Sequence, residues 1–277
     1  MNKQILADSH SHTTCSPDGR DSVLEMCEKA KSLEFSYYTV ADHCECNDYK
    51  GIEFGFNYEK GVRFSAEKVA EAREIMTAPG FTVLRGMELG QPMQNIKAAE
   101  DALDREHDFV LASVHNIKNF EDFYYLDYEK TSDAVIDELL QSYFSEIMET
   151  IEWGRFDAIA HLTYPLRYIV GDHKRSVDIK KHMGSIEKIF AIMIEKNKAL
   201  EVNTSGLRQN IGCLLPNEPL LKRYHEMGGR LVTLGSDAHT SDDLGKGISE
   251  GIAVLKSVGF YEYAVYIEHK PKMISIL

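Results

Sequence analysis

Short apolar segments alternate with longer amphipathic segments along most of this chain. The short segments are rich in β-branched and aromatic residues, as buried parallel strands are. We expect seven strands, at residues 5–7, 37–40, 81–84, 109–112, 158–160, 199–202 and 231–234.

The segments between these strands carry apolar residues at three- and four-residue spacing, which predicts amphipathic helices. Ser65 is a favourable N-cap for the second helix, and Gly228-Gly229 is typical of a helix end. The predicted helices cover about residues 21–33, 65–76, 131–153, 183–197 and 216–227.

Repeated strand–helix units predict an α/β fold built on a parallel sheet. No linker or low-complexity tract divides the chain, so we expect one domain over residues 1–277, closed as a βα barrel. An open doubly wound sheet uses the same elements and stays an alternative, because strand order cannot be read from the sequence. The connections 44–64, 116–130 and 162–175 exceed the usual loop length of about 2–6 residues, so we expect them to form walls of a site.

The composition of the chain argues against nucleic-acid and membrane partners. The 277 residues include 31 Lys and Arg against 44 Asp and Glu, a formal charge of −13 that disfavours a general nucleic-acid binder. No apolar run approaches the roughly 20 residues that cross a bilayer, and no signal-peptide core precedes Asp8. Five cysteines without framework spacing indicate reduced thiols. We therefore expect a cytoplasmic protein with no membrane or nucleic-acid partner.

Polar residues of a few types follow the predicted strands. They are Asp8, His10, His12, Asp42, His43, Glu88, His115, His161, Asn203, Asp237 and His239. The carboxyl ends of parallel strands meet on one face, so six of the eleven histidines should converge there. A single histidine beside a strand is more often structural, but six together with Asp8, Glu88 and Asp237 are not explained that way. The histidines at 107, 173, 182, 225 and 269 follow no strand and receive no metal role.

Imidazole and carboxylate donors at this density suit divalent zinc, manganese or iron. The donors outnumber the ligands of one ion, so we expect two to three ions that share a bridging carboxylate. Cys44 and Cys46, one residue apart, are interpreted as ordinary thiols despite their position beside His43.

The ordered motifs from residue 8 to residue 239 resemble those of the polymerase-and-histidinol-phosphatase (PHP) superfamily of metal-dependent phosphoesterases. They are Asp8-Ser-His10-Ser-His12, Asp18-Gly19, Ala41-Asp42-His43, Gly86-Met87-Glu88, Ser113-Val114-His115, Ala160-His161 and Gly235-Ser236-Asp237-Ala238-His239. The resemblance implies a distorted seven-stranded βα barrel with the metal site at the carboxyl ends of its strands.

The resemblance also implies three metal ions. The first would be held by His10, His12, Glu88 and Asp237; the second by Glu88, His115 and His161; the third by Asp18, His43 and His239. Asp8 and Asp42 would orient ligand imidazoles through the other ring nitrogen. Glu88, Asp237 and His239 are expected to be catalytic, because the ions lower the pKa of a shared water and neutralise phosphoryl oxygens.

Two arginines, Arg167 in His161-Leu-Thr-Tyr-Pro-Leu-Arg167 and Arg208 in Asn203-Thr-Ser-Gly-Leu-Arg208, are candidates for phosphate binding. Their pairing resembles the monofunctional histidinol phosphatase branch of the superfamily. That branch implies hydrolysis of L-histidinol phosphate to L-histidinol and phosphate in histidine biosynthesis. Acidic loop residues could face the cationic part of this substrate, and Tyr124 or Tyr125 could stack on its imidazole, but the sequence selects none. The acidic candidates are Glu45, Asp48, Glu53, Glu121 and Asp122.

Three other functions stay open. The first is a phosphoesterase of the same fold acting on a nucleotide or another small phosphate. The second is an amidohydrolase-type hydrolase, although Glu88 stands where that class commonly has a modified lysine. The third is a non-catalytic metal-binding or sensor domain, which would be expected to have lost ligands.

Overall fold

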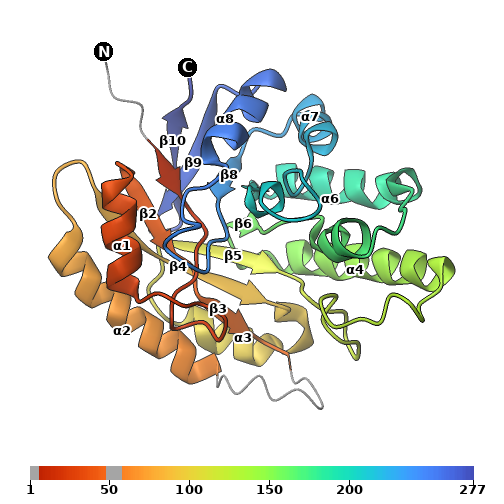
Figure 1. The fold of residues 1–277 in the computed structure, drawn as a ribbon, viewed down its shortest axis with the longest axis horizontal. Coiled ribbons are helices and arrows are strands. Elements are labelled where there is room, and N and C mark those ends of the chain that lie inside the picture. Colours follow the sequence, from red (N-terminus) through yellow and green to blue (C-terminus); the bar gives the residue numbers. More distant parts are fainter. Residues whose placement is uncertain (1–5, 48–57) are drawn as a thin grey trace.

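Seven parallel strands form the centre of the computed structural model, which describes residues 6–47 and 58–277 (Figure 1). Each strand pairs with the next along the path β1-β2-β4-β5-β6-β7-β8. The strands are β1 (Ala7–Asp8), β2 (Tyr37–Val40), β4 (Thr82–Gly90), β5 (Phe109–Ser113), β6 (Ala158–Ile159), β7 (Ala199–Asn203) and β8 (Val232–Gly235). All seven predicted strands are therefore confirmed, with end points shifted by a few residues.

Backbone hydrogen bonds join the first and last strands of this path. The Ser9 amide donates to the Leu234 carbonyl at 2.9 Å, and the Asp237 amide donates to the His10 carbonyl at 2.8 Å. Ser11 and Ala238 form a parallel bridge one step further along. The sheet is thus a nearly closed barrel, which decides against the open doubly wound alternative.

A short strand that the sequence did not predict, β3 (His43–Glu45), continues the direction of β2 and pairs with β4. The register places His43 directly opposite Glu88. Strand β4 also extends to Gly90, so Glu88 lies inside a strand and not after its end. This pairing brings two of the predicted ligands side by side.

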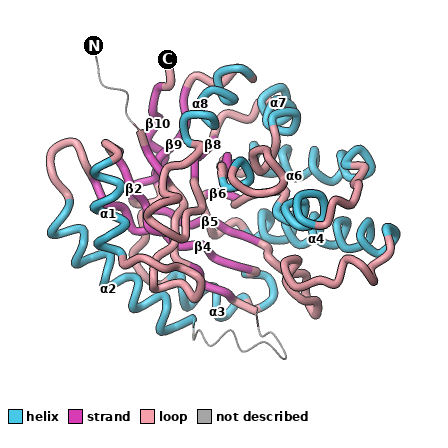
Figure 2. The backbone as a smooth tube through the Cα atoms, in the orientation of Figure 1, coloured by secondary structure: helices cyan, strands magenta, loops and turns pink. Residues whose placement is uncertain are grey.

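Helices surround the barrel (Figure 2). Helices α1 and α2 pack together on one side, and α4 and α6 pack together on another. Ser22 and Glu25 form a reciprocal capping box at the start of α1, and Asn217 caps α7. The longer helices are α1 (Val23–Ser32), α2 (Tyr58–Met76), α3 (Ile96–Leu103), α4 (Asp133–Trp153), α6 (Met183–Glu195), α7 (Glu218–Glu226) and α8 (Ile248–Ser257). Shorter helical turns are η1 (Pro92–Gln94), α5 (Tyr164–Leu166), η2 (Arg167–Asp172), η3 (Ile179–His182) and η4 (Ser205–Leu207).

The predicted start of the second helix is wrong. Helix α2 begins at Tyr58, so Ser65 lies within it and does not cap it. The Ser65 hydroxyl is buried and donates to Asp42 at 2.7 Å. Ser65, a residue type that is common at N-caps, therefore makes a tertiary hydrogen bond instead.

An antiparallel hairpin of β9 (Glu262–Ile267) and β10 (Lys270–Ser275) covers the end of the barrel where the strands begin. Tyr266 stacks on Phe109, the first residue of β5, with ring centroids 5.1 Å apart. Small residues such as Ala158 and Ala199 share this buried layer. The opposite end, where the strands finish, is left for the polar cluster. Within the part of the chain that the structure describes, no helix is both long and apolar enough to span a membrane.

Candidate metal centre

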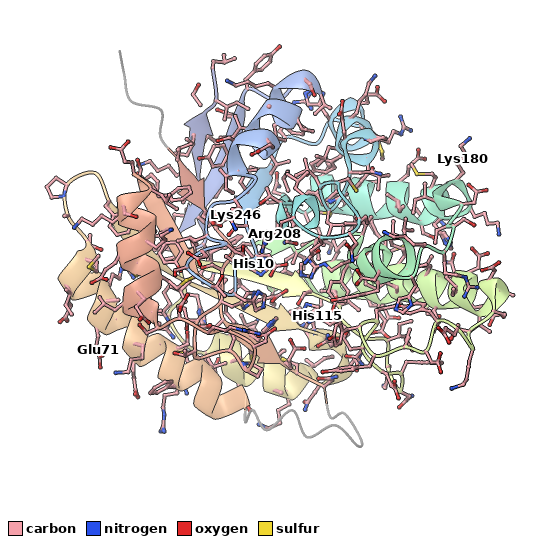
Figure 3. The ribbon with its side chains drawn as sticks, viewed as in Figure 1. His10, Glu71, His115, Lys180, Arg208 and Lys246 are labelled. Carbon is pink, nitrogen blue, oxygen red and sulfur yellow. The ribbon has the colours of Figure 1, made fainter. Side chains whose placement is uncertain are left out.

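The nine predicted ligands come together at the carboxyl ends of the strands. Figure 3 shows His10 and His115 toward the middle of the molecule, whereas Glu71 and Lys180 lie at its periphery. Four groups of three side chains have donor atoms close enough to hold a metal ion: His10, His12 and Asp237; His10, Glu88 and His161; His43, Glu88 and His115; and His12, His43 and His239. Asp18 adjoins the last group, because its carboxylate lies 3.0 Å from His239 Nε2.

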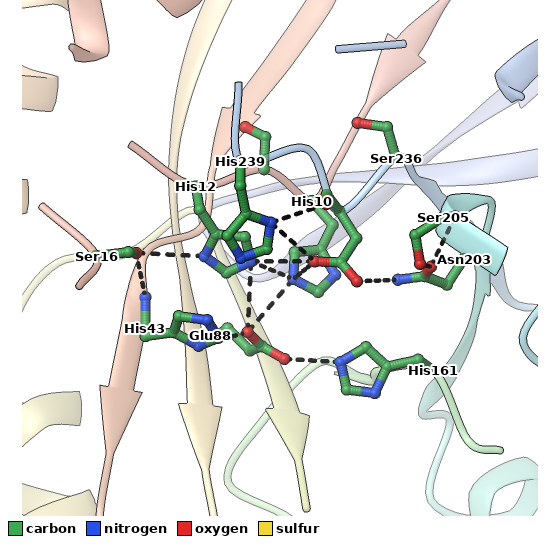
Figure 4. Close-up of polar contacts among 12 residues, drawn as sticks. His10, His12, Ser16, His43, Glu88, His161, Asn203, Ser205, Ser236 and His239 are labelled. Atoms are coloured by element: carbon green, nitrogen blue, oxygen red, sulfur yellow. Dashed lines mark hydrogen bonds and ion pairs between the residues drawn. The ribbon is translucent and has the colours of Figure 1, made fainter. Parts of the chain in front are cut away.

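Glu88 occupies the centre of the cluster (Figure 4). Its Oε1 atom lies 2.9 Å from His161 Nε2 and 3.1 Å from His115 Nε2. Its Oε2 atom lies 2.8 Å from His43 Nδ1 and 3.5 Å from Nε2 of both His10 and His12. The two carboxylate oxygens therefore face different sets of imidazoles, the arrangement that a carboxylate shared by two ions requires.

The side chains of the cluster fit divalent ions. His10 Nε2 and His12 Nε2 point at each other across 3.1 Å, although a neutral imidazole has only one N–H to donate. Glu88 Oε2 is buried and has no hydrogen-bond partner among the described residues. Lone pairs that converge without donors favour a bound cation, and imidazole with carboxylate suits zinc, manganese or iron.

Burial and neighbouring charges act in opposite directions on members of the cluster. Burial would lower the pKa of His10, His43 and His115, but the neighbouring carboxylates raise it above the ordinary value. Burial alone would raise the pKa of Glu88, but His115, His43 and His10 hold it well below its ordinary value. Burial, followed by His43 and His239, lowers the pKa of His12 to about 3. Glu88 is therefore a carboxylate and His12 a neutral imidazole at neutral pH.

Glu201 is an orienting residue that the sequence reasoning did not assign. Its Oε1 atom lies 2.6 Å from His10 Nδ1, and its Oε2 atom accepts the His161 amide N–H at 2.7 Å. Gly235 makes room for it, because a Cβ there would overlap the Glu201 carboxylate. The available signal was its position on β7, two residues before Asn203 and hence on the same face.

Glu45 has the same role on the other side of the cluster. Its Oε1 atom lies 3.2 Å from His115 Nδ1 and 3.3 Å from His43 Nδ1. Gly90 accommodates this carboxylate, as Gly235 accommodates Glu201. Burial would raise the pKa of Glu45, but His115 and His43 lower it to about 2, so the group is an anion.

The predicted contacts of Asp8 and Asp42 with imidazole rings are wrong. Asp8 accepts backbone N–H groups, from Ser236 at 2.9 Å and from His10 at 3.3 Å. Asp42 accepts the Ser16 hydroxyl at 2.7 Å, and the same hydroxyl oxygen lies 3.3 Å from His12 Nδ1. Asp42 therefore reaches the His12 ring through Ser16, and Asp8 contacts backbone amides. Glu201 and Glu45 lie beside the Nδ1 atoms instead.

A cavity of about 530 Å³ opens beside the cluster, a size typical of sites for small molecules. Arg167 lines it and donates to Asp237 Oδ2 at 2.9 Å and to Ser205 Oγ at 2.8 Å. The Arg167 Nε atom is buried and has no hydrogen-bond partner in the described chain. Arg167 thus brings a guanidinium to the wall of the cavity beside the cluster, and a guanidinium can bind an anion.

Arg208 lies beside the cavity-lining Asp237 but is not itself among the lining residues, so its role in phosphate binding stays a prediction. Its terminal nitrogens donate to the carbonyl oxygens of Ser236 at 2.7 Å and Asp237 at 2.8 Å. Asp237 has a φ of 53°, which is strained for a residue other than glycine. Arg208 thus holds the strained turn that presents Asp237 and His239.

The remaining histidines and cysteines singled out in the sequence lie outside the ligand groups. The five histidines outside the motifs belong to none of the donor groups found among the described residues. His182, for example, pairs with Asp137 at 3.0 Å. Cys44 and Cys46 are buried free thiols. Asp48 and Glu53 lie outside the described residues.

Comparison with known proteins gives a consistent result. The profile of the PHP domain family matches residues 8–205. A protein named probable histidinol-phosphatase from Thermotoga maritima is 29% identical over 260 residues, which cover 94% of this chain and 95% of that protein. A protein named probable phosphatase from Photobacterium profundum is 26% identical over 279 residues, which cover 99% of this chain and 94% of that protein.

A solved structure gives the same fold. The histidinol phosphate phosphatase from Lactococcus lactis subsp. lactis, complexed with zinc, L-histidinol and phosphate, superimposes with a TM-score of 0.78 at 22% identity. The superposition covers 98% of this chain and 100% of that one. This chain belongs to the PHP domain family, and the expected family and barrel are confirmed.

Proposed function

We propose that this protein is a metal-dependent phosphomonoesterase that hydrolyses L-histidinol phosphate to L-histidinol and phosphate. One observation carries the proposal: a guanidinium, that of Arg167, lies against Asp237 at 2.9 Å in the cavity that also exposes the imidazole–carboxylate cluster. An anion-binding fork beside a divalent metal centre is the arrangement that phosphate-ester hydrolysis requires.

The proposed ligand sets follow the geometry of the cluster. His10, His12 and Asp237 would hold one ion with Glu88 Oε2, and His115 and His161 would hold a second with Glu88 Oε1. Asp18, His43 and His239 would hold a third at the cavity mouth, where Asp18 is 57% exposed. Such ions, when bound, lower the pKa of a water and neutralise phosphoryl oxygens.

The residues of the chain have separate tasks in this proposal. Glu88, as an anion at the centre, would be a ligand shared by the first two ion sites. Arg167 orients the phosphate through its fork, and the buried Asp237 aligns that fork. Arg208 acts indirectly by holding the turn that carries Asp237 and His239.

The substrate is supported by the relatives' names and by charge. The Thermotoga relative is named a probable histidinol-phosphatase, and the Lactococcus enzyme was solved with L-histidinol and phosphate. The formal charge of −13 suits a substrate with a cationic tail better than a polyanion. A phosphoesterase acting on another small phosphate is the second candidate, because the Photobacterium relative is named only as a phosphatase.

The test is phosphate release by the metal-loaded full chain. L-Histidinol phosphate is assayed beside nucleoside monophosphates, a 3′,5′-nucleoside bisphosphate and short single-stranded DNA. We expect the highest kcat/KM for histidinol phosphate. A nucleotide that matches it would overturn the substrate assignment, and no turnover of any phosphate would favour the sensor alternative.

A further inference from the structure

One wall of the cavity is aromatic, and it reaches the histidine cluster at Tyr164. Tyr124 and Tyr125, from the connection between β5 and α4, are 60% and 47% exposed and meet edge to face at 4.8 Å. Tyr124 also contacts Tyr168 at 5.6 Å, and Tyr168 contacts Tyr164 at 5.2 Å. Four tyrosines thus line the cavity. Tyr164 and Tyr168 are buried, whereas Tyr124 and Tyr125 expose apolar ring surface that proteins usually bury.

Asp122 lies among these tyrosines and also lines the cavity. Its Oδ1 atom accepts the Tyr164 hydroxyl at 2.9 Å and the Tyr124 amide N–H at 2.8 Å. None of the ion pairs found among the described residues gives Asp122 a Lys or Arg partner, in contrast to Asp237, which has Arg167. Burial raises the pKa of Asp122, because desolvation disfavours its charged form and the nearby groups compensate for this only in part.

Tyr164 contacts both charged groups that the cavity offers to a ligand. The Arg167 guanidinium lies over its ring at 5.1 Å, and the His115 ring lies 4.9 Å away. Its hydroxyl donates to Asp122, whose backbone bridges to Asn116 beside His115. Arg167 and Asp122 thus contact Tyr164 at different atoms, so a compact ligand with an anionic and a cationic end can lie across Tyr164 and contact both.

We propose that Asp122, together with Tyr124 and Tyr125, binds the cationic end of the substrate, an ammonium or a protonated imidazole. The carboxylate supplies a charge-assisted hydrogen bond and the ring faces supply cation–π attraction. The same wall disfavours nucleotides, whose additional anionic groups meet a carboxylate. This inference rests on the proposed phosphomonoesterase activity, and it adds the residues that select the substrate.

Asp122→Asn is an informative variant, because an amide oxygen can still accept both hydrogen bonds that Asp122 accepts. The charge is lost while the Tyr164 and Tyr124 contacts remain. Glu121→Gln is the matched control, since Glu121 is the exposed neighbour and does not line the cavity. Tyr124→Phe keeps the aromatic ring, whereas Tyr124→Leu keeps only an apolar side chain. Comparison of the two variants therefore measures the contribution of the ring face to binding.

The primary measurement is the Kd of L-histidinol for each metal-loaded full chain by calorimetry. We expect Asp122→Asn to weaken binding by about tenfold or more, and Tyr124→Leu to weaken it by a smaller factor that still exceeds the effect of Tyr124→Phe. Glu121→Gln should leave binding unchanged. The kcat/KM for histidinol phosphate should fall with Asp122→Asn, while that for p-nitrophenyl phosphate, whose tail is uncharged, should not.

The outcomes separate this inference from the proposed function. An unchanged Kd in Asp122→Asn, or an equal loss of turnover for both esters, would overturn the cation site even if wild-type protein hydrolyses histidinol phosphate. Conversely, if wild-type protein fails to hydrolyse histidinol phosphate but binds L-histidinol in an Asp122-dependent way, the cation site stands and the proposed substrate falls.

Discussion

The Glu201 carboxylate lies 2.6 Å from Nδ1 of His10, and both side chains are fully buried. The contact fixes the tautomer of His10, because Nδ1–H donates to the carboxylate and the Nε2 lone pair then faces Glu88 and Asp237. A carboxylate behind a ligand imidazole also increases the basicity of the ring. Glu201 is thus a determinant of the centre although it offers no ligand atom to it.

Glu201→Gln should lower zinc affinity by roughly 10–100-fold, the usual effect of losing a carboxylate behind a ligand histidine. Glu88→Gln should lower it further, because Glu88 faces imidazoles delivered by several strands. Competition with a chromogenic chelator measures both, and Glu268→Gln, in the exposed turn between β9 and β10, is the control. Equal metal affinity in wild type, Glu88→Gln and Glu201→Gln would contradict the assignment of both residues.

The purified protein should contain two to three divalent ions per chain. Chelator treatment should abolish phosphate-ester hydrolysis, and zinc, manganese or iron should restore it, since the imidazole and carboxylate ligand atoms of the cluster converge on shared positions. Elemental analysis beside activity provides the check. Full activity at less than one equivalent of metal would rule out the metal mechanism.

Substitution of Arg167 should mainly affect catalysis, whereas substitution of Arg208 should mainly affect stability. Arg167→Ala should keep the fold but raise the barrier for phosphate-ester hydrolysis by about 2–4 kcal/mol, because it removes the guanidinium in the cavity. Arg208→Ala should lower the free energy of unfolding by about 2 kcal/mol, because two carbonyl contacts are lost. Denaturant unfolding and kcat/KM measured on both variants distinguish these effects. An unaltered kcat/KM in Arg167→Ala would show that the arginine is only structural.

Gly90→Ala should weaken metal binding and lower stability by about 1–3 kcal/mol, because the added methyl overlaps the Glu45 carboxylate beside His115. Gly184→Ala is the matched control, since a Cβ at Gly184 in α6 meets no atom within 4 Å. That substitution should be neutral or stabilise by about 0.5–1 kcal/mol. Thermal unfolding measures the stability of the two variants, and zinc titration measures their metal affinity. Equal stability and equal zinc affinity in Gly90→Ala and Gly184→Ala would refute the packing argument.

His107 should make the fold sensitive to acid. Burial, followed by the nearby Arg85, lowers the pKa of His107 to about 4 in the folded chain, against about 6.5 when unfolded. The unfolded chain therefore binds the proton more readily, and stability falls as pH drops from about 6.5 toward 4.

His107→Gln should remove roughly 3 kcal/mol of this pH dependence, as the shift implies. Urea unfolding at several pH values in this window measures it, with the exposed His173→Gln as control. If His107→Gln and wild type lose stability in parallel, the histidine is not responsible.

Much of the barrel could be predicted because its strands and main helices carry local signals. Buried apolar runs mark the seven strands, and spaced apolar residues mark α1, α4, α6 and α7. Strand β3 could not be found this way, because it is three residues long and exists only through pairing with β4. Helix α2 started earlier than expected, since a side chain that suits a cap can equally serve a tertiary bond.

The predicted ligands converge because their positions follow from strand ends, a rule that needs no knowledge of distances. The partners of the rings were harder to predict. Glu201 and Asp8 both lie near His10, but Glu201 reaches its ring, next to Gly235, whereas Asp8 accepts its backbone amide. The contacts of Arg208 were hard to predict for a similar reason, because the backbone carbonyls that accept its hydrogen bonds cannot be identified from a sequence.

The hydrogen bonds between the start of the barrel and its last strand have a consequence for folding. His12 donates its amide to the Ala238 carbonyl at 2.8 Å, so segments more than two hundred residues apart in the chain assemble one donor group. Such contacts form late, because closing so long a loop is entropically costly. The complete donor set therefore exists only after β8 has docked, and metal binding will stabilise the closed barrel over every partly folded form that precedes it.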